Sequence, residues 1–284
     1  MTLKPRNITR IIRAMETSDG AGVRLKRSIG TPQLDYLDPF LLLDEFKSDQ
    51  RDDYIAGFPD HPHRGFETVT YMLAGSMEHK DHTGNQGTLV SGSVQWMTAG
   101  KGIIHSEMPK QEEGLMWGFQ LWVNLPEAKK MSEPRYQEFT PDEIPVVSHE
   151  DGTVTRVIAG ESGGAVGAVQ GIATEPLYLD VTLPPGKRFE QPVKEGHNLF
   201  AYVFEGEGEL GAADEQKGQQ VGAGQLALFS DGDGVVATSR DVPMRFLLLA
   251  ARPLNEPMVR SGPFVMSSEE QIREAFRDYR EGRF

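Results

Sequence analysis

The chain has 284 residues, 38% of them hydrophobic and 25% charged, which is the composition of an ordinary soluble globular protein with one large domain or two smaller ones. Its formal net charge of −13 disfavours direct contact with nucleic acid, because the phosphates and the protein repel each other. Cysteine is absent, which excludes disulfides, thiolate catalysis and cysteine-ligated zinc. The sequence has neither an apolar run of membrane-spanning length nor the apolar core of a signal peptide at its start, so we expect a cytoplasmic protein with no membrane partner.

Short apolar runs separated by glycine and proline follow one another along most of the chain. The 31 glycines and 18 prolines punctuate these runs as they do in all-β proteins, and we predict an all-β fold. The predicted strands, in chain order, cover residues 8–14, 66–73, 92–97, 118–124, 177–182, 199–204, 225–229 and 244–250.

The C-terminal segment is the exception, because its apolar residues follow helical spacing. Ser267 with Glu270 three residues later forms the pattern of a capping box at the start of a helix. Apolar residues then recur on one face up to Tyr279, and Gly282 follows the last of them, where helices commonly end. We therefore predict a short C-terminal helix with a packing role.

The two halves of the chain are weakly alike. Aligning residues 71–75 (YMLAG) with residues 202–206 (YVFEG) gives an offset of 202 − 71 = 131 residues, which also pairs Gly65 with Gly196. Such a repeat predicts two tandem β-domains. We place an N-terminal, metal-binding domain at residues 1–140 and a C-terminal domain, without metal and ending in the helix, at residues 141–284.

Two pairs of candidate metal ligands stand out, His61 with His63 and His105 with Glu107. Side chains two residues apart on a strand point to the same face, so each pair can aim both of its groups at one point. A single pair of this kind is more often an ordinary polar feature, but two pairs in strand-like, glycine-rich contexts favour a shared mononuclear site. Imidazole and carboxylate donors together suit iron, manganese, nickel, cobalt or zinc rather than calcium or magnesium.

The remaining histidines lack this pattern. His149 and His197 stand alone, whereas His79 and His82 lie in a polar stretch that we interpret as a loop. Under the offset of 131 residues, the four candidate ligands all correspond to residues that are poor substitutes for imidazole and carboxylate. These residues are Pro192, Lys194, Val236 and Thr238. The second half is therefore predicted to be metal-free.

Residues 61–71 (HPHRGFETVTY) and 95–108 (QWMTAGKGIIHSEM) strongly resemble the pirins, a family of the cupin superfamily. The resemblance extends to residues 40–46, 120–126 and 262–266, and so covers nearly the whole chain. It implies a bicupin, which consists of two antiparallel jelly-roll β-barrels with the metal in the N-terminal one. It also implies that His61, His63, His105 and Glu107 bind the metal, usually Fe(II), with Mn, Ni, Co, Cu or Zn as alternatives.

Glu67 needs a separate interpretation, because cupins in general often use a glutamate four residues after the second histidine as a ligand. In the pirins, the carboxylate ligand is instead the one two residues after the last histidine. The resemblance therefore implies that Glu107 is the ligand and that Glu67 has a supporting or structural role.

Two functions remain open for such a site. Several pirins resemble quercetin 2,3-dioxygenases in activity, which implies an oxidoreductase that opens flavonol-like phenols with O2. The metal then offers open positions to substrate and O2, and Glu107 is the catalytic base that takes a proton from a substrate hydroxyl. Other pirins are iron-dependent, redox-sensitive regulators that bind a transcription factor or a metabolic enzyme. In that case a change in metal charge near exposed residues such as Arg64 alters the binding of a protein partner.

The shape of the site separates these alternatives. A deep apolar mouth above the metal favours catalysis, and a closed site beneath a charged flat surface favours the regulator. The candidate wall residues are large apolar side chains that, taken singly, are more often part of a core. They are Phe46, Phe58, Phe66, Trp96, Met97 and Trp122.

Overall fold

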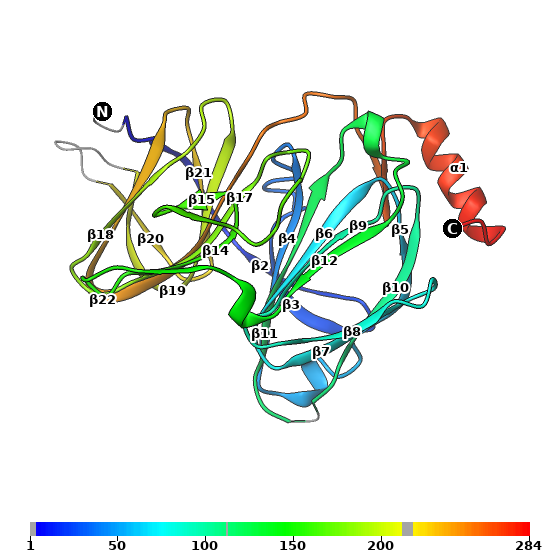
Figure 1. Ribbon diagram of the computed structural model, residues 1–284, viewed down its shortest axis with the longest axis horizontal. Coiled ribbons are helices and arrows are strands. Elements are labelled where there is room, and N and C mark those ends of the chain that lie inside the picture. The colour runs from blue at the N-terminus through cyan, green and yellow to red at the C-terminus, as the bar shows by residue number, and fades with distance from the viewer. Residues whose placement is uncertain (1–3, 112, 212–217) are drawn as a thin grey trace. The chain divides into compact units, whose positions relative to one another are not determined.

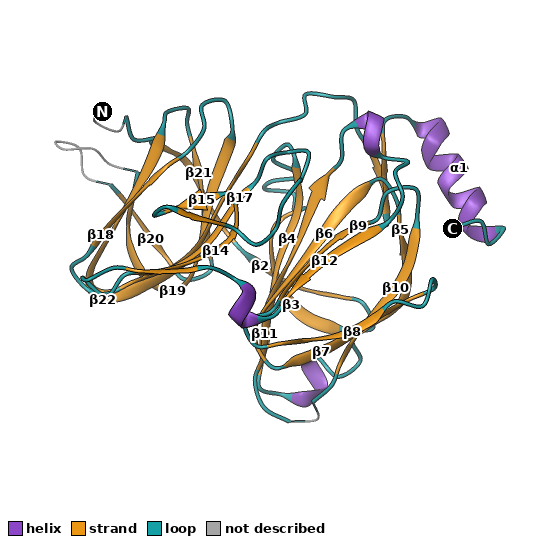
Figure 2. Cartoon of the chain, viewed as in Figure 1, coloured by secondary structure: helices purple, strands orange, loops and turns teal. Residues whose placement is uncertain are grey.

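The computed structural model describes residues 4–111, 113–211 and 218–284. Strands and loops make up most of these residues, with three short 3-10 turns and the α-helix α1 (Glu269–Arg280) (Figure 2). No helix in this part of the chain is long and apolar enough to cross a membrane. The all-β fold with a short C-terminal helix is thus confirmed.

The chain forms two compact units, and each unit is built from two separate stretches of sequence. One unit combines Met1–Ala14 with Asp142–Pro253, and the other combines Met15–Pro141 with Leu254–Phe284. This differs from the contiguous domains expected at residues 1–140 and 141–284. The break near residue 141 agrees, but both ends of the chain belong to the unit opposite to the one expected.

Specific contacts explain why the ends are exchanged. The first strand, β1 (Ile8–Arg13), completes the edge of a sheet by pairing with β21 (Gln225–Phe229). At the other end, Val265 shares a buried apolar cluster with Leu41 and Phe66. Gly65, at φ +87°, permits this approach, since a Cβ there would lie 2.0 Å from the carbonyl oxygen of Val265.

The unit formed by residues 15–141 and 254–284 contains two facing antiparallel sheets (Figure 1). Its seven-stranded sheet has the order β12 (Arg135–Phe139), β9 (Val94–Thr98), β6 (Phe66–Ala74), β11 (Met116–Asn124), β4 (Phe40–Ser48), β3 (Val23–Ile29) and β2 (Met15–Asp19). Its four-stranded sheet has the order β5 (Phe58–His63), β10 (Ile103–Pro109), β7 (Ser76–Asp81) and β8 (Gln86–Val90). A hairpin of β23 (Val259–Ser261) and β24 (Phe264–Met266) packs against α1.

The unit formed by residues 1–14 and 142–253 is built around one nine-stranded sheet. Its main path is β1, β21, β19 (Asn198–Leu210), β22 (Gly234–Ala251), β17 (Leu177–Leu183), β14 (Val154–Ala159) and β13 (Val146–Ser148). Off this path, β18 (Arg188–Pro192) pairs with β22 and β20 (Gln219–Gly222) pairs with β19. A small hairpin joins β15 (Glu161–Ser162) to β16 (Ala165–Val166).

The sequence repeat corresponds to matching elements in the two units. Tyr71 lies in β6 and Tyr202 in β19, and both are fully buried. A glycine with positive φ follows β6 at Gly75 (89°), and a corresponding glycine lies within β19 at Gly206 (67°). All eight predicted strands are confirmed, although β22 is much longer than the predicted residues 244–250.

The predicted helix is confirmed, but its N-terminal cap was wrong by one residue. Ser268, rather than Ser267, is the N-cap, and its hydroxyl oxygen accepts a hydrogen bond from the Gln271 amide at 3.3 Å. Gln271 in turn accepts from the Ser267 amide at 2.9 Å. Either serine could be the N-cap, because Glu269, Glu270 and Gln271 follow the two of them. The face of the helix that is buried selects Ser268.

Candidate metal centre

The predicted ligand pairs lie side by side on two neighbouring antiparallel strands. His61 on β5 is directly opposite His105 on β10, and His63 is opposite Ile103. The ladder shifts register after His105, so that Glu107 faces Phe58 across the pair. The two-residue spacing therefore brings the histidines together as predicted. The shift in register changes the position of Glu107, the fourth candidate ligand.

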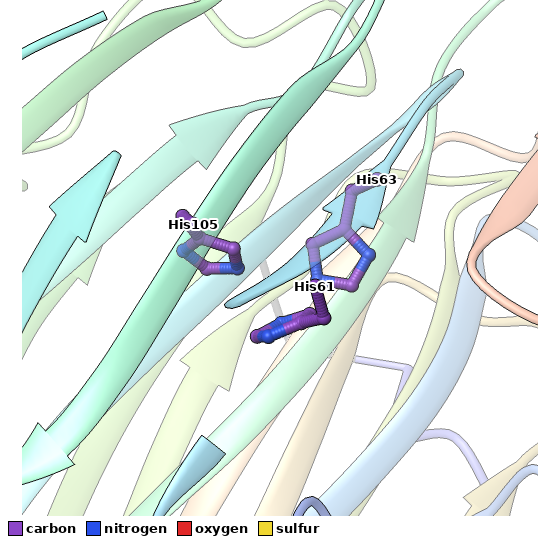
Figure 3. A group of neighbouring side chains, drawn as sticks. All are labelled: His61, His63 and His105. Atoms are coloured by element: carbon purple, nitrogen blue, oxygen red, sulfur yellow. The ribbon is translucent and has the colours of Figure 1, made fainter. Parts of the chain in front are cut away.

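The three imidazoles converge on one point (Figure 3). Ring centroids are 4.7 Å apart for His61 and His63, 4.4 Å for His61 and His105, and 5.0 Å for His63 and His105. One nitrogen from each ring lies within 4.8 Å of the other two. A single transition metal bound by all three nitrogens fits such a cluster.

The protonation of these rings is suited to metal binding. His63 is 2% exposed and His105 is 1% exposed. Burial, followed by the neighbouring imidazoles, holds the pKa of both well below the usual histidine value, so the rings are neutral. His61 lies with Nδ1 2.7 Å from the carbonyl oxygen of Pro59, and donation of that N–H would leave Nε2 as the free donor atom.

Unpaired nitrogens supply an independent test of the metal hypothesis. Both ring nitrogens of His105 and Nδ1 of His63 are buried without a hydrogen-bond partner among the described residues. Buried polar atoms are rarely left unpaired, because their lost hydration is costly. A bound metal ion would satisfy one nitrogen of each ring, so the residues present fit the predicted group.

Glu107 is buried beside the three-histidine group but is not a member of it. The carboxylate is 4% exposed, and its Oε1 accepts a hydrogen bond from the Thr70 hydroxyl at 2.8 Å. The same hydroxyl lies 2.8 Å from the side-chain oxygen of Gln120. Thr70 therefore fixes the carboxylate, and its coordination of a metal stays a prediction.

Glu67 lies on the other face of β6 from the site. Phe66 contacts His63, with 5.0 Å between ring centroids, and Thr70 contacts Glu107, so even-numbered residues of β6 face the site. Glu67 instead accepts a hydrogen bond from the Thr98 hydroxyl at 2.7 Å, and burial raises the pKa of its carboxyl. These contacts support a structural role.

His79 was wrongly assigned to a loop. It lies in β7, opposite Glu107 of β10, and is only 4% exposed. Its Nε2 is 2.7 Å from a carboxylate oxygen of Glu138. The alternation of buried Met77 and His79 with the charged Glu78 and Lys80 was the missed signal, because such alternation marks a half-buried strand. His82 does lie in a turn, as predicted.

A cavity of about 540 Å³ opens above the histidines. His61, His63 and Glu107 lie in its wall, and so do three of the predicted large side chains, Phe46, Phe58 and Trp122. The other three predicted wall residues, Phe66, Trp96 and Met97, are core residues instead and do not line the cavity.

Arg260 is a wall residue that the sequence did not indicate. Its guanidinium carbon lies 4.9 Å from the centre of the Trp122 ring, and one of its nitrogens donates to the Leu41 carbonyl oxygen at 3.1 Å. The sequence around Arg260 does not indicate a site residue. Arg260 reaches the site because residues 254–284 belong to the same unit as residues 15–141. The tail motif at residues 262–266 was the nearest signal.

In the other unit, the strand pairing of β18 with β22 shows that the residue equivalent to His105 lies two positions earlier than the constant offset of 131 residues predicts. Pro192 on β18, which corresponds to His61 in the repeat, lies opposite Gly234 of β22. The constant offset had instead matched His105 to Val236, which faces Glu190. A difference in loop length between the halves accounts for the shift, and neither register brings an imidazole or a carboxylate from β22 to this position.

Comparison with known proteins places the chain among relatives with this architecture. The family model described as Pirin matches residues 22–123, and that of the Pirin C-terminal cupin domain matches residues 178–284. A pirin-like protein of Caulobacter vibrioides is 49% identical over 98% of this chain and 99% of its own length. Pirin of Homo sapiens is 46% identical over 97% of this chain and 92% of its own. The crystal structure of a quercetin 2,3-dioxygenase from Acinetobacter baumannii has a TM-score of 0.89, with 34% identity over 99% of this chain and 98% of that one.

Proposed function

This chain belongs to the pirin family of two-domain cupins, and from that premise we propose that it is a metal-dependent oxygenase that opens flavonol-like phenols with O2. The observation that carries the proposal is the group of three histidines at a cavity of about 540 Å³. A 34% identical relative described as a quercetin 2,3-dioxygenase supports this reaction class.

The proposed ligands are His61, His63, His105 and Glu107, and the proposed metal is Fe(II). Three imidazoles and one carboxylate would leave a divalent ion with a net charge of about +1 and with open coordination positions. When bound, such an ion supplies Lewis acidity toward a hydroxyl of the substrate and an affinity for O2.

Glu107 is the proposed proton acceptor. A flavonol has to lose the proton of its 3-hydroxyl before its ring becomes reactive toward O2, and a carboxylate at the cavity wall is placed to take it. The hydrogen bond from Thr70 keeps the Glu107 carboxylate in a fixed orientation at the wall. Thr70 is thus a positioning residue in this proposal.

The cavity walls would bind the flat rings and exclude water. Phe46 and Phe58 offer apolar surface, and Trp122 lies 5.2 Å from His63 between ring centroids, so an aromatic ligand can stack beside the histidines. Arg260, held above Trp122, places a positive charge at the same wall. Because Asp19, Asp44 and Asp60 line the same cavity, these polar groups together favour a polyhydroxylated ring over a wholly apolar one.

The regulatory alternative receives less support. Arg64, which was expected to present an exposed charge near the metal, is 3% exposed and pairs with Asp278 at 2.8 Å. Its guanidinium also lies over the Phe284 ring at 4.3 Å. The expectation of an exposed Arg64 was wrong, and an open cavity with apolar walls favours binding of a small molecule.

The test is oxygen uptake by the reconstituted protein. The chain would be loaded anaerobically with Fe(II), and in parallel with Mn, Co, Ni, Cu or Zn, and then mixed with quercetin in oxygenated buffer. We expect oxygen uptake with quercetin and none with luteolin, the matched flavone without the 3-hydroxyl. Iron that stays bound while no flavonol consumes oxygen would reject the proposal and favour a regulator.

A further inference from the structure

We propose that Asp44 selects which phenols the cavity above the histidines binds, by accepting a hydrogen bond from an aromatic hydroxyl at the far end of the substrate. The inference rests on the proposed binding of a flavonol-like phenol at this cavity, and it adds a residue that distinguishes between such phenols. The expected substrates carry at least one neutral hydroxyl besides the one that loses its proton to Glu107.

A row of polar side chains crosses the seven-stranded sheet from β3 to β12, on the face that carries Thr70. Its members lie directly opposite one another on successive strands. In spatial order they are Arg27, Asp44, Gln120, Thr70, Gln95 and Glu138. Thr70 connects the row to the site, because its hydroxyl donates to Glu107 at 2.8 Å. Asp44 and Gln120 line the cavity.

The corresponding row in the other unit is apolar. The sequence repeat matches Thr70 with Ala201, since 201 − 70 = 131. Leu179 is the counterpart of Asp44, because it lies opposite Leu248, which in turn lies opposite Ala201. The whole row is fully buried in one apolar cluster and consists of Leu179, Leu248, Ala201 and Ala227. A related sheet therefore folds without polar groups at these positions. Because burial of polar groups costs free energy, a role in binding explains the polar row better than stability does.

Arg27 holds the Asp44 carboxylate in a fixed orientation. Its Nε donates to Oδ1 at 2.8 Å, and its Nη2 donates to Oδ2 at 2.7 Å. A carboxylate has about four acceptor positions, so this fork leaves room for other donors, and no further donor to Asp44 is found within residues 4–111, 113–211 and 218–284. Asp44 is 3% exposed, and burial raises the pKa of its carboxyl to about 6, so at pH 7.5 the group is ionised but poorly hydrated. Such an acceptor is stabilised by a hydrogen bond from a ligand.

The charges around the cavity favour a neutral donor over an acidic group. The carboxylates that line the wall are those of Asp19, Asp44, Asp60 and Glu107. Arg260 is the one Lys or Arg side chain among the described residues of the wall. Arg27 adds a positive charge beside Asp44, but it also pairs with Asp19 at 2.7 Å. No excess of positive charge is therefore available to bind an acidic substituent. A hydroxyl gives Asp44 a hydrogen without adding a negative charge.

The position of Asp44 matches the length of a flavonol. Asp44 and Thr70 are two strands apart in the same row, which is roughly 10 Å at the usual spacing of neighbouring strands. Between them, Gln120 presents a side-chain amide to the cavity, and Trp122 provides an aromatic surface two residues further along β11. A planar ligand that lies along this wall with one hydroxyl at Glu107 has its far ring near Asp44.

The experiment compares flavonols that differ by one hydroxyl at the far end. They are 3-hydroxyflavone, 3,7-dihydroxyflavone and 3,4′-dihydroxyflavone. Isothermal titration calorimetry at pH 7.5 would measure their binding to the intact chain, both metal-free and loaded with Zn(II), which does not oxidise the ligand. We expect one or both of the dihydroxy compounds to bind at least about tenfold more tightly than 3-hydroxyflavone, as a hydrogen bond to a charged group requires. Equal affinities for all three compounds would overturn the proposal.

Variants of Asp44 test the residue itself. Asp44→Asn keeps the size but removes the charge, so the preference for a dihydroxy compound should fall below about threefold while the affinity for 3-hydroxyflavone changes less. Asp44→Leu introduces the side chain that the other unit has at this position and should abolish the preference. Asp180→Asn is the matched control, because Asp180 is 2% exposed, accepts from Nε and Nη2 of Arg245 at 3.1 and 2.7 Å, and does not line this cavity. It should leave the preference intact.

Binding and oxygen uptake separate this proposal from that of the oxygenase. A preference in binding that Asp44→Asn removes supports the role of Asp44, and if the iron-loaded chain then consumes no oxygen, only the oxygenase is rejected. Oxygen uptake together with a preference that Asp44→Asn leaves unchanged would retain the oxygenase and overturn the role of Asp44. An equal loss of affinity for all three flavonols in Asp44→Asn would also overturn it, because the carboxylate would then support the wall without selecting the ligand.

Discussion

At the scale of single residues, His105 is the side chain on which the metal site depends most directly. It lies on β10 opposite His61, is 1% exposed and has no hydrogen-bond partner for either ring nitrogen in the described structure. We expect His105→Ala to lower metal affinity more than about tenfold, because a ligand contact is lost. Elemental analysis after anaerobic loading measures this, and the exposed His149→Ala serves as the control. Full metal content in His105→Ala would contradict the assignment.

The two buried glutamates give a matched pair of variants. Glu107→Gln keeps the size and the hydrogen bond from Thr70 but removes the base and a ligand charge, so we expect weaker metal binding and loss of turnover even with excess metal. Glu67→Gln, whose carboxylate is bonded to Thr98 on the other face of β6, should keep more metal and more activity.

Loading both glutamate variants with iron under nitrogen and then measuring turnover of quercetin compares them directly. If Glu67→Gln loses its metal and Glu107→Gln keeps it, the carboxylate ligand follows the general cupin pattern. The proposed proton transfer to Glu107 would then be wrong as well.

At the scale of elements, Lys130 joins the 3-10 turn Glu127–Lys129 to the barrel and to β24. Its ammonium donates to the carbonyl oxygens of Gly65 and Val265 and to Oδ1 of Asn124, at 2.5–3.0 Å, and the residue is 2% exposed. We expect Lys130→Met to lower the free energy of unfolding by about 1–3 kcal/mol, because three buried acceptors lose their donor. Urea unfolding measures this, with the exposed Lys101→Met as the control.

The same lysine predicts a pH dependence. Burial lowers the pKa of Lys130 to about 8, whereas in the unfolded chain it is near 10.5. Between these values the unfolded chain binds more protons than the folded one, so the contribution of Lys130 to stability increases as the pH rises from about 8 to 10.5. The difference in unfolding free energy between the unaltered chain and Lys130→Met should therefore grow over this range. A constant difference would show that the ammonium is not penalised by burial.

The elements also show what the sequence could and could not predict. The spacing of His61 with His63 and of His105 with Glu107 predicted that each pair shares one face of a strand, because local spacing decides which face a side chain occupies. The strand β7 was missed because its inward residue is His79, a polar side chain that composition alone assigns to a loop. Arg260 and Lys130 could not be predicted, since their roles come from contacts made more than a hundred residues away.

At the scale of the whole molecule, the exchange of chain ends has a measurable consequence. A chain that stops at residue 253 would lose Arg260 from the cavity and Val265 from the cluster with Leu41 and Phe66. We expect residues 15–141 of such a chain to become sensitive to protease and to bind less metal, while residues 142–253 stay resistant. Mass spectrometry of the fragments identifies the sensitive part. Contiguous domains at residues 1–140 and 141–284 would produce the opposite result.

The two units also differ in the metals that they can hold. One brings three imidazoles together, whereas the other has Pro192 and Lys194 at the positions of His61 and His63, and an ammonium repels a cation. Gly234, across the ladder from Pro192, offers no side-chain donor. We therefore expect at most about one transition metal per chain after loading with excess Fe(II), and close to none in His105→Ala. Anomalous scattering at the iron edge would locate the ion between His61, His63 and His105, and a ratio near two metals per chain would show that the other unit binds metal by donors other than those of β18 and β22.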